Sequence, residues 1–315
     1  MKTTLSTTLL AAAVLALAGP AAAQTTWDLS PAHCVQNAAN AGSFGNTWTC
    51  PSATASPSVT LSAWSSDRGT TRTGTTAAVV EANSFVLTGS GFASAFLSPQ
   101  GTSGFGAVSR FEAQEARLAG DTSPLTPGSP NHAFDSVAPG TVDLLLLNFS
   151  SSVVLSQIGI GWHGGDSDVT VMRWTGTASP TISNGNLTDT VGTTGWSLVG
   201  SYSNLGVDNT TPFGGAARNT GASDAMTSSW WLVSTFNTTL NGGTRNCTAE
   251  NGTTTTCLPN DLKGNDSFKF NFVAFRTPTP PGNGGNQVSE PTTLALFGAA
   301  ALAWLGGSLR RRRAA

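Results

Sequence analysis

Charged side chains are scarce in this chain of 315 residues. Only 10% of the residues are Asp, Glu, Lys or Arg, whereas about a quarter is usual for a soluble domain. Lysine occurs only at Lys2, Lys263 and Lys269. Affinity for nucleic acid depends on cationic side chains that neutralise phosphates, so this composition excludes a nucleic-acid-binding protein.

Strong helix formers are also rare, with five glutamates against 80 serines and threonines and 36 glycines. This composition excludes helical bundles and coiled coils, because those are built from good helix formers such as Leu, Glu and Lys. Hydroxyl groups must then provide much of the solvation that charges usually give. We therefore predict an all-β protein with hydroxyl-coated strands.

Short runs of β-branched and aromatic residues alternate with Gly, Ser and Asn, which is typical of a β-sandwich or barrel. The runs are residues 59–64, 142–149, 153–162, 169–174, 196–199, 230–236 and 268–275. We predict one antiparallel β-sandwich domain, jelly-roll-like, over residues 24–276. Residues 144–147 should be covered on both faces, residues 268–275 should have one solvated face, and a helix is expected only over residues 109–119.

The N-terminal residues 1–23 have the pattern of a secretory signal peptide. Lys2 supplies the positive charge, residues 9–18 form the apolar run, and residues 21–23 are alanines suited to cleavage by signal peptidase. The apolar run is too short to cross a bilayer, which takes roughly 20 residues. We therefore expect the chain to be exported.

The C-terminal residues 289–315 combine a short polar box, an apolar stretch and a basic cluster. As a helix, residues 292–309 would span roughly 27 Å, close to the thickness of the membrane hydrocarbon. The basic cluster should stay cytoplasmic and consists of Arg310, Arg311, Arg312 and Arg313. Residues 277–288 are rich in Pro, Gly and Asn and are interpreted as a spacer. A single-span membrane anchor is the simplest interpretation of the tail.

The tail, with Ser289, Glu290 and Pro291 before the apolar helix and the terminal arginines, resembles the PEP-CTERM sorting signal of Gram-negative bacteria. The resemblance covers residues 288–315, and Ser289 stands where the family has its first proline. It implies processing by an exosortase. It also implies an inner-membrane-anchored precursor that reaches the cell surface or the extracellular space, in association with exopolysaccharide and biofilm.

Four cysteines fit an exported domain: Cys34, Cys50, Cys247 and Cys257. They allow three connectivities. We favour the pairs Cys34–Cys50 and Cys247–Cys257 because neighbouring thiols meet most easily, and Asn251-Gly252 between the last two is a strong hairpin signal. A zinc site is the alternative, but no C-x-x-C pair occurs and an exported chain meets an oxidising compartment.

Motifs for catalysis are absent from the sequence, which contains neither G-x-S-x-G nor H-E-x-x-H. Glu112 and Glu115 lie three residues apart on the predicted helix, next to arginines, and we interpret them as a solvated surface. A hydrolase whose carboxylates are brought together by the fold is the least favoured alternative. We predict that the protein is not an enzyme.

The segment from Gly161 to Asp168 lies between two predicted strands and is expected to be a hairpin connection. Asp166 and Asp168 offer oxygen ligands for a structural Ca²⁺ ion, and Asp135 or Asp143 could add more. The EF-hand pattern is absent, however. The favoured alternative is that both aspartates of the segment accept hydrogen bonds from backbone amides in a turn.

Residues 131–174 resemble the exported domain of a group of exosortase-dependent surface proteins. The similarity rests on a strand that ends in Leu-Asn-Phe, a second that ends in Gly-Trp-His, and the following Asp-Ser-Asp-Val-Thr-Val-Met-Arg-Trp. It implies no catalytic residue. We therefore predict a non-enzymatic surface or extracellular-matrix protein.

Tryptophan supports an alternative function, since eight tryptophans lie outside the tail. Exposed rings could stack on neutral sugars, as in a carbohydrate-binding module, whereas core packing is the simpler interpretation. Trp162, Trp174 and Trp230 are expected to be internal from their apolar neighbours. Trp230 and Trp231 must point to opposite faces of a strand, so that one of them can be exposed.

Overall fold

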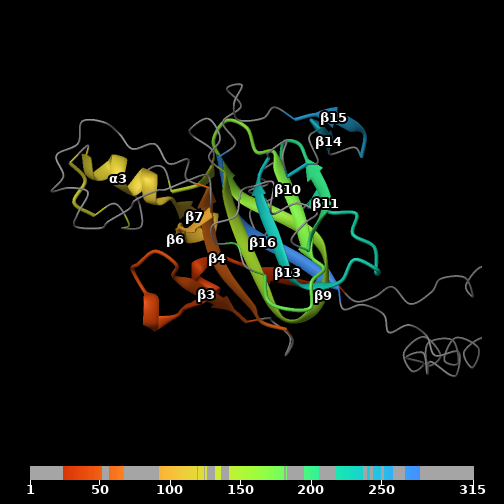
Figure 1. Ribbon diagram of the computed structural model, residues 1–315, viewed down its shortest axis with the longest axis horizontal. Helices are drawn as coiled ribbons and strands as arrows, with labels where there is room; N and C mark the ends of the chain where they lie inside the picture. The colour runs from red at the N-terminus through yellow and green to blue at the C-terminus, as the bar shows by residue number, and fades with distance from the viewer. Residues whose placement is uncertain are drawn as a thin grey trace, which may run out of the picture. The chain divides into compact units, whose positions relative to one another are not determined.

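Strands dominate the part of the chain that the structure describes (Figure 1). The structure is a computed structural model, and it describes residues 24–51, 57–66, 92–118, 120–123, 125, 132–135, 142–180, 182, 195–205, 218–236, 240–241, 244–249, 252–257 and 267–276. The predicted signal peptide, spacer and sorting tail lie outside these residues. Within the described residues, no helix is both long enough and apolar enough to cross a membrane.

The strands alternate with a few short helices. The first eight strands are β1 (Gln24–Asp28), β2 (Val35–Gln36), β3 (Thr47–Cys50), β4 (Val59–Ser66), β5 (Phe92–Ser94), β6 (Phe96–Pro99), β7 (Phe105–Val108) and β8 (Phe134–Asp135). The others are β9 (Asp143–His163), β10 (Val169–Trp174), β11 (Trp196–Tyr202), β12 (Arg218–Asn219), β13 (Ser228–Thr235), β14 (Asn246–Thr248), β15 (Thr254–Thr256) and β16 (Ser267–Arg276). The helices are η2 (Pro31–His33), η3 (Ala38–Asn40), η4 (Gly101–Ser103) and α3 (Arg110–Leu118). The predictions of an all-β fold and of a short helix near residues 109–119 are confirmed.

Strand β9 organises the whole sheet. Its residues 143–153 pair with β4 and β13, and its residues 154–163 pair with β16. We call one part of the sheet the β13 wing; it consists of the first half of β9 with β4, β10, β11 and β13. We call the other part the β16 wing; it consists of the second half of β9 with β1, β7, β8 and β16. All described pairs are antiparallel except that of β11 with β14.

The sequence predicts two separate strands where the structure has the single strand β9. The polar residues between them, Ser150, Ser151 and Ser152, have the composition of a turn, and all three are exposed. They stay extended because the strand passes there from one wing to the other. The predicted hairpin of β9 with β10 is wrong as well, since β10 pairs with β11 and β13, and β13 lies between β9 and β10.

The main core takes apolar side chains from both wings, including Leu145 and Val233 of the β13 wing and Ile158 and Phe270 of the β16 wing. A second cluster lies on the other face of the β13 wing and contains Leu144, Leu146, Met172, Trp196 and Leu232. Residues 144–147 are therefore covered on both faces, as the unbroken leucine run predicts.

Strand β16 differs from its prediction. Its alternating pattern predicts one solvated face, but Asn271 is 2% exposed and Ala274 is buried. Strand β16 is an inner strand, with β9 on one edge and β1, β7 and β8 on the other, and the rest of the domain covers the side chains of Asn271 and Ala274. Irregular register against β9 also breaks the simple alternation of its faces.

Two disulfides close local loops of the domain. Cys34 pairs with Cys50 and Cys247 pairs with Cys257, which is the pairing that sequence proximity favours. The second bond joins β14 to the residue that follows β15, across a turn in which Gly252 has a φ of 80°. Disulfides form and persist outside the reducing cytosol, so the domain belongs to an extracellular or periplasmic environment.

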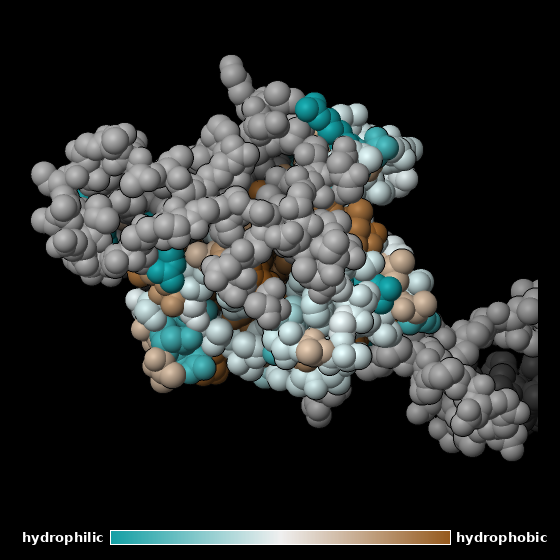
Figure 2. Space-filling model, in the orientation of Figure 1, coloured by the Kyte–Doolittle hydropathy of each residue, from teal (hydrophilic) through white to brown (hydrophobic). Residues whose placement is uncertain are grey.

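The described surface is wetted mainly by uncharged groups. Figure 2 shows that most described atoms on the visible face are near the middle of the hydropathy scale, where Ser, Thr and Gly lie, with only scattered strongly hydrophilic residues. Residues 23–278 form one compact unit. This unit contains every described residue, and the candidate sites are sought within it.

Candidate functional site

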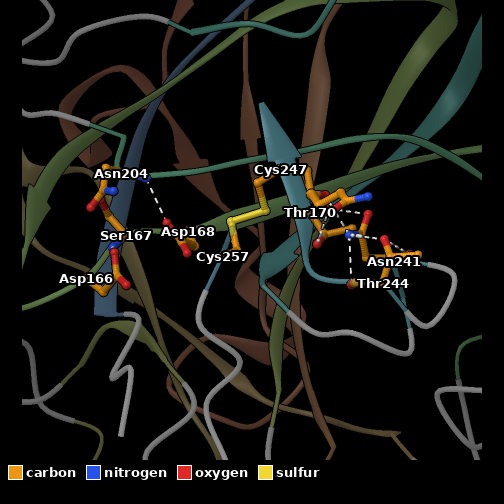
Figure 3. Close-up of a disulfide and its surroundings, with 11 residues drawn as sticks. Asp166, Ser167, Asp168, Thr170, Asn204, Asn241, Thr244, Cys247 and Cys257 are labelled. Carbon is orange, nitrogen blue, oxygen red and sulfur yellow. Dashed lines mark hydrogen bonds between the residues drawn. A yellow bond between two sulfur atoms is a disulfide. The ribbon is translucent and has the colours of Figure 1, made fainter. Parts of the chain in front are cut away.

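The loop between β9 and β10 holds two of the aspartates from the predicted Ca²⁺ site, and Figure 3 shows both of them. The Asp166 carboxylate accepts a hydrogen bond from the backbone N–H of Ser167 at 2.8 Å. The Asp168 carboxylate accepts one from the backbone N–H of Asn204, also at 2.8 Å. Asp166 therefore makes a bond of the kind that the alternative interpretation expects within the turn, whereas Asp168 binds a backbone amide of the segment after β11.

Asp135, the third residue of the predicted Ca²⁺ site, lies elsewhere. Asp135 is the strand partner of Ser267 on the edge of β16 that pairs with β8. On the opposite edge, which pairs with β9, the backbone N–H of Ser267 donates to the carbonyl of Asp166 at 3.1 Å. Strand β16 thus separates Asp135 from Asp166 and Asp168. The structure instead brings Asp135 together with Glu112 and Asp143.

These three carboxylates form the carboxylate cluster, a group that comes from α3, β8 and β9. One oxygen from each lies within 4.8 Å of the others, and among the described residues this is the one such group of three acidic, His or Cys side chains. Asp135 is 6% exposed and Asp143 is 2% exposed. The interpretation of Glu112 as part of a solvated surface is wrong, because its side chain is half-buried and faces the two aspartates.

A shallow pocket of about 360 Å³ lies where β10 and β13 meet the loop after β10. Among the described residues, its lining includes Arg173, Trp174 and Trp230, together with Ser, Thr, Gly and Ala residues. The Trp174 indole packs edge-on against Trp196 with ring centres 5.3 Å apart. Its N–H donates to the carbonyl of Ala178 at 2.6 Å. Two half-buried indoles thus lie among hydroxyl and backbone groups, and none of the described lining residues carries a carboxylate.

The tight packing around Trp174 has a local cause. A Cβ at Gly176 would lie 2.5 Å from the Trp174 ring, which no real side chain tolerates. Ser228 helps to fix the other side of the pocket, because its hydroxyl lies 2.8 Å from the carbonyls of both Trp174 and Trp230. The ring of Trp174 is therefore held in place by glycine on one side and by hydrogen-bonded backbone on the other.

The structure corrects the expectation that Trp162 is internal. It is 37% exposed, and the Lys269 ammonium group lies 4.6 Å from the centre of its ring. Partial burial lowers the pKa of Lys269 below its ordinary value because the charged form loses hydration. Trp174 and Trp230 are also only partly buried, whereas Trp231 is fully buried on the opposite face of β13.

A buried polar network beside the second disulfide needs no ligand to explain it (Figure 3). The hydroxyls of Thr170 and Ser201 are 2.9 Å apart, and Ser201 donates to the Asn241 side chain at 2.9 Å. The Asn241 amide donates in turn to the carbonyls of Thr244 and Asn246. The network joins β10 and β11 to the segment before β14, and its bonds stabilise this end of the domain.

The sequence alone does not predict the carboxylate cluster or the pocket of Trp174 and Trp230. Glu112 completes the pattern Ser109-x-x-Glu112 of a helix N-terminal capping box, which places a carboxylate at the start of α3 but does not say what faces it. Trp174 and Trp230 share a pocket only because β10 and β13 are neighbours. Comparison of the chain with protein-family models, with curated proteins and with solved structures gives no match.

Proposed function

We propose that this chain is a non-enzymatic protein of the cell surface or extracellular matrix, sorted by an exosortase through its C-terminal tail. The observation that carries the proposal is the order of the tail, with Glu290-Pro291, an apolar stretch and terminal arginines. The two disulfides support it, because they suit a chain that is cut by signal peptidase and folds outside the cytoplasm.

Removal of Arg310, Arg311, Arg312 and Arg313 tests the sorting step. We expect the truncated chain to be misrouted, since these cations hold the end of the apolar stretch on the cytoplasmic side. Surface display is measured by antibody labelling of intact cells and by fractionation. Substitution of all four by Lys is the matched control, because it keeps the charge. Unchanged display of the truncated chain would refute the proposal.

We propose sugar binding at the pocket of Trp174 and Trp230 as a second candidate function. Two half-buried indoles offer apolar faces for a sugar ring, and the surrounding Ser and Thr hydroxyls offer hydrogen bonds. The domain is poor in cations, which favours neutral exopolysaccharide over anionic polymers. Sugar binding is compatible with sorting by an exosortase, because the pocket lies in the domain and the sorting signal lies in the C-terminal tail.

Replacement of Trp230 by Ala is expected to weaken binding of the host's own exopolysaccharide at least tenfold, which corresponds to about 1.4 kcal/mol. Isothermal titration measures the affinity. Trp162→Ala is the matched control, since it removes another partly exposed indole far along β9 from the pocket. No heat with the unchanged protein, or equal losses in both variants, would count against the pocket.

We also infer that the two wings are the two layers of a β-sandwich. Their shared core supports this arrangement, since a sandwich buries the inner faces of two sheets against each other. Jelly-roll connectivity remains a prediction.

A further inference from the structure

The carboxylate cluster joins parts of the chain that are far apart in sequence. Glu112 lies in the first turn of α3, Asp135 ends β8, and Asp143 begins β9. Two of the three are almost completely buried. Carboxylate oxygens are the ligands that Ca²⁺ prefers in proteins, and here three of them are gathered at one place.

The carboxylates are positioned by backbone groups as well as by packing. The Glu112 carboxylate accepts a hydrogen bond from the backbone N–H of Ser109 at 2.7 Å, and the Ser109 hydroxyl accepts one from the backbone N–H of Glu112 at 3.0 Å. The Asp143 carboxylate accepts one from the backbone N–H of Asp135 at 3.3 Å. The capping box and this link orient carboxylates from two sides of the cluster before any ligand binds.

A separate observation comes from the neighbouring strand. Ser65 of β4 is directly opposite Asp143 of β9, and the next pair on the same face, Ala63 with Leu145, belongs to the main core. Side chains opposite each other in an antiparallel pair project to the same side, with Cβ atoms about 4.5–5.5 Å apart. The Ser65 hydroxyl therefore projects toward the cluster.

Ser65 is 1% exposed, and its hydroxyl has no hydrogen-bond partner among the residues that the structure describes. A buried hydroxyl without a partner is unfavourable by about 1–3 kcal/mol. A cation bound at the cluster would accept this oxygen as a ligand. The hydroxyl and the three carboxylates thus point independently to the same occupant.

We propose that Glu112, Asp135, Asp143 and Ser65 form a binding site for a Ca²⁺ ion. Two oxygens that bind one Ca²⁺ at about 2.3–2.6 Å cannot be more than roughly 5 Å apart, and the carboxylates meet this limit. Four oxygen ligands suit a hard cation and not zinc or copper. Ca²⁺ suits a buried site better than Mg²⁺, which keeps several of its waters.

Burial argues against the hydrolase alternative at this place. Glycoside hydrolases hold their two carboxylates on either side of a bound substrate. Here Asp135 and Asp143 are almost completely buried. The ion would instead link α3 and β8 to the paired strands β4 and β9, so that its role is structural.

The purified full-length protein tests the proposal by thermal unfolding in EGTA and in excess Ca²⁺, with isothermal titration of Ca²⁺ in parallel. At a hundredfold excess over the dissociation constant, Ca²⁺ should raise Tm by about 5–10 °C. Mg²⁺ at the same concentration should give a smaller shift. No shift and no heat with Ca²⁺, or an equal shift with Mg²⁺, would overturn the assignment.

Two variants locate the ion. Asp143→Asn should abolish the Ca²⁺-dependent shift, and Glu112→Gln should reduce the affinity at least tenfold while Gln still serves in the capping box. The second variant keeps the test decisive if the first does not fold. Asp166→Asn is the matched control, and its response to Ca²⁺ should equal that of the unchanged protein. A response lost in Asp166→Asn and kept in Glu112→Gln would place the ion in the loop after β9 and overturn the proposal.

Discussion

Trp231→Ala is expected to lower the free energy of unfolding by about 3–5 kcal/mol, which is the usual loss when a large buried aromatic side chain is removed. The Trp231 indole is fully buried in the main core, and its N–H donates to the carbonyl of Ser228 at 3.0 Å. The substitution removes both the packing and the hydrogen bond, and leaves a cavity in the main core. Urea denaturation followed by fluorescence or circular dichroism measures the loss.

The adjacent residue provides the control. Trp230 is only half-buried and projects to the opposite face of β13, where it lines the pocket. Trp230→Ala should therefore lower the free energy of unfolding by less than half of the loss in Trp231→Ala, although both substitutions remove a side chain of the same size. Equal losses in the two variants would mean that the assignment of faces along β13 is wrong.

Removal of the Cys34–Cys50 disulfide by a double substitution to Ala is expected to lower the free energy of unfolding by about 3 kcal/mol. The bond spans 16 residues, and closing a loop of this length restricts the unfolded chain by about that amount in the chain-entropy model. Thermal and urea unfolding under oxidising conditions measure the effect.

The same substitution of Cys247 and Cys257 is the matched comparison, because their sequence separation of 10 residues predicts nearly the same loss. The two bonds close separate loops, so the losses should add in a quadruple variant. Reduction of the unchanged protein should bring its unfolding midpoint close to that of the quadruple variant. A midpoint that does not respond to reduction would contradict the pairing.

Features that depend on nearby residues could be predicted from the sequence. The unbroken run Leu144–Leu147 predicts burial on both faces, and all four side chains are buried. The helix over residues 109–119 follows from its good helix formers. The favoured cysteine pairs lie close in sequence, and the structure joins the same cysteines. In each case the signal itself lies within one short stretch of the sequence, at most the 16 residues that separate Cys34 from Cys50.

Features that depend on pairing between distant strands could not be predicted. Asp143 meets Ser65 only through the register of β4 with β9, and Asp135 is placed only through β8 and β16. A one-residue change in either register would turn these side chains to the other face. Composition at Ser150–Ser152 likewise predicts a turn, because only the whole sheet shows that β9 continues through it.

The pairing of β1 with β16 has a consequence for the timing of folding. Every residue of β1, from Gln24 to Asp28, has its partner in the last described strand, between Arg276 and Phe272. The second half of β9 depends on the same strand. Contacts of such long sequence separation form slowly, and these cannot form at all until the ribosome has made the end of the domain. The β16 wing therefore stays incomplete until the ribosome has made most of the chain.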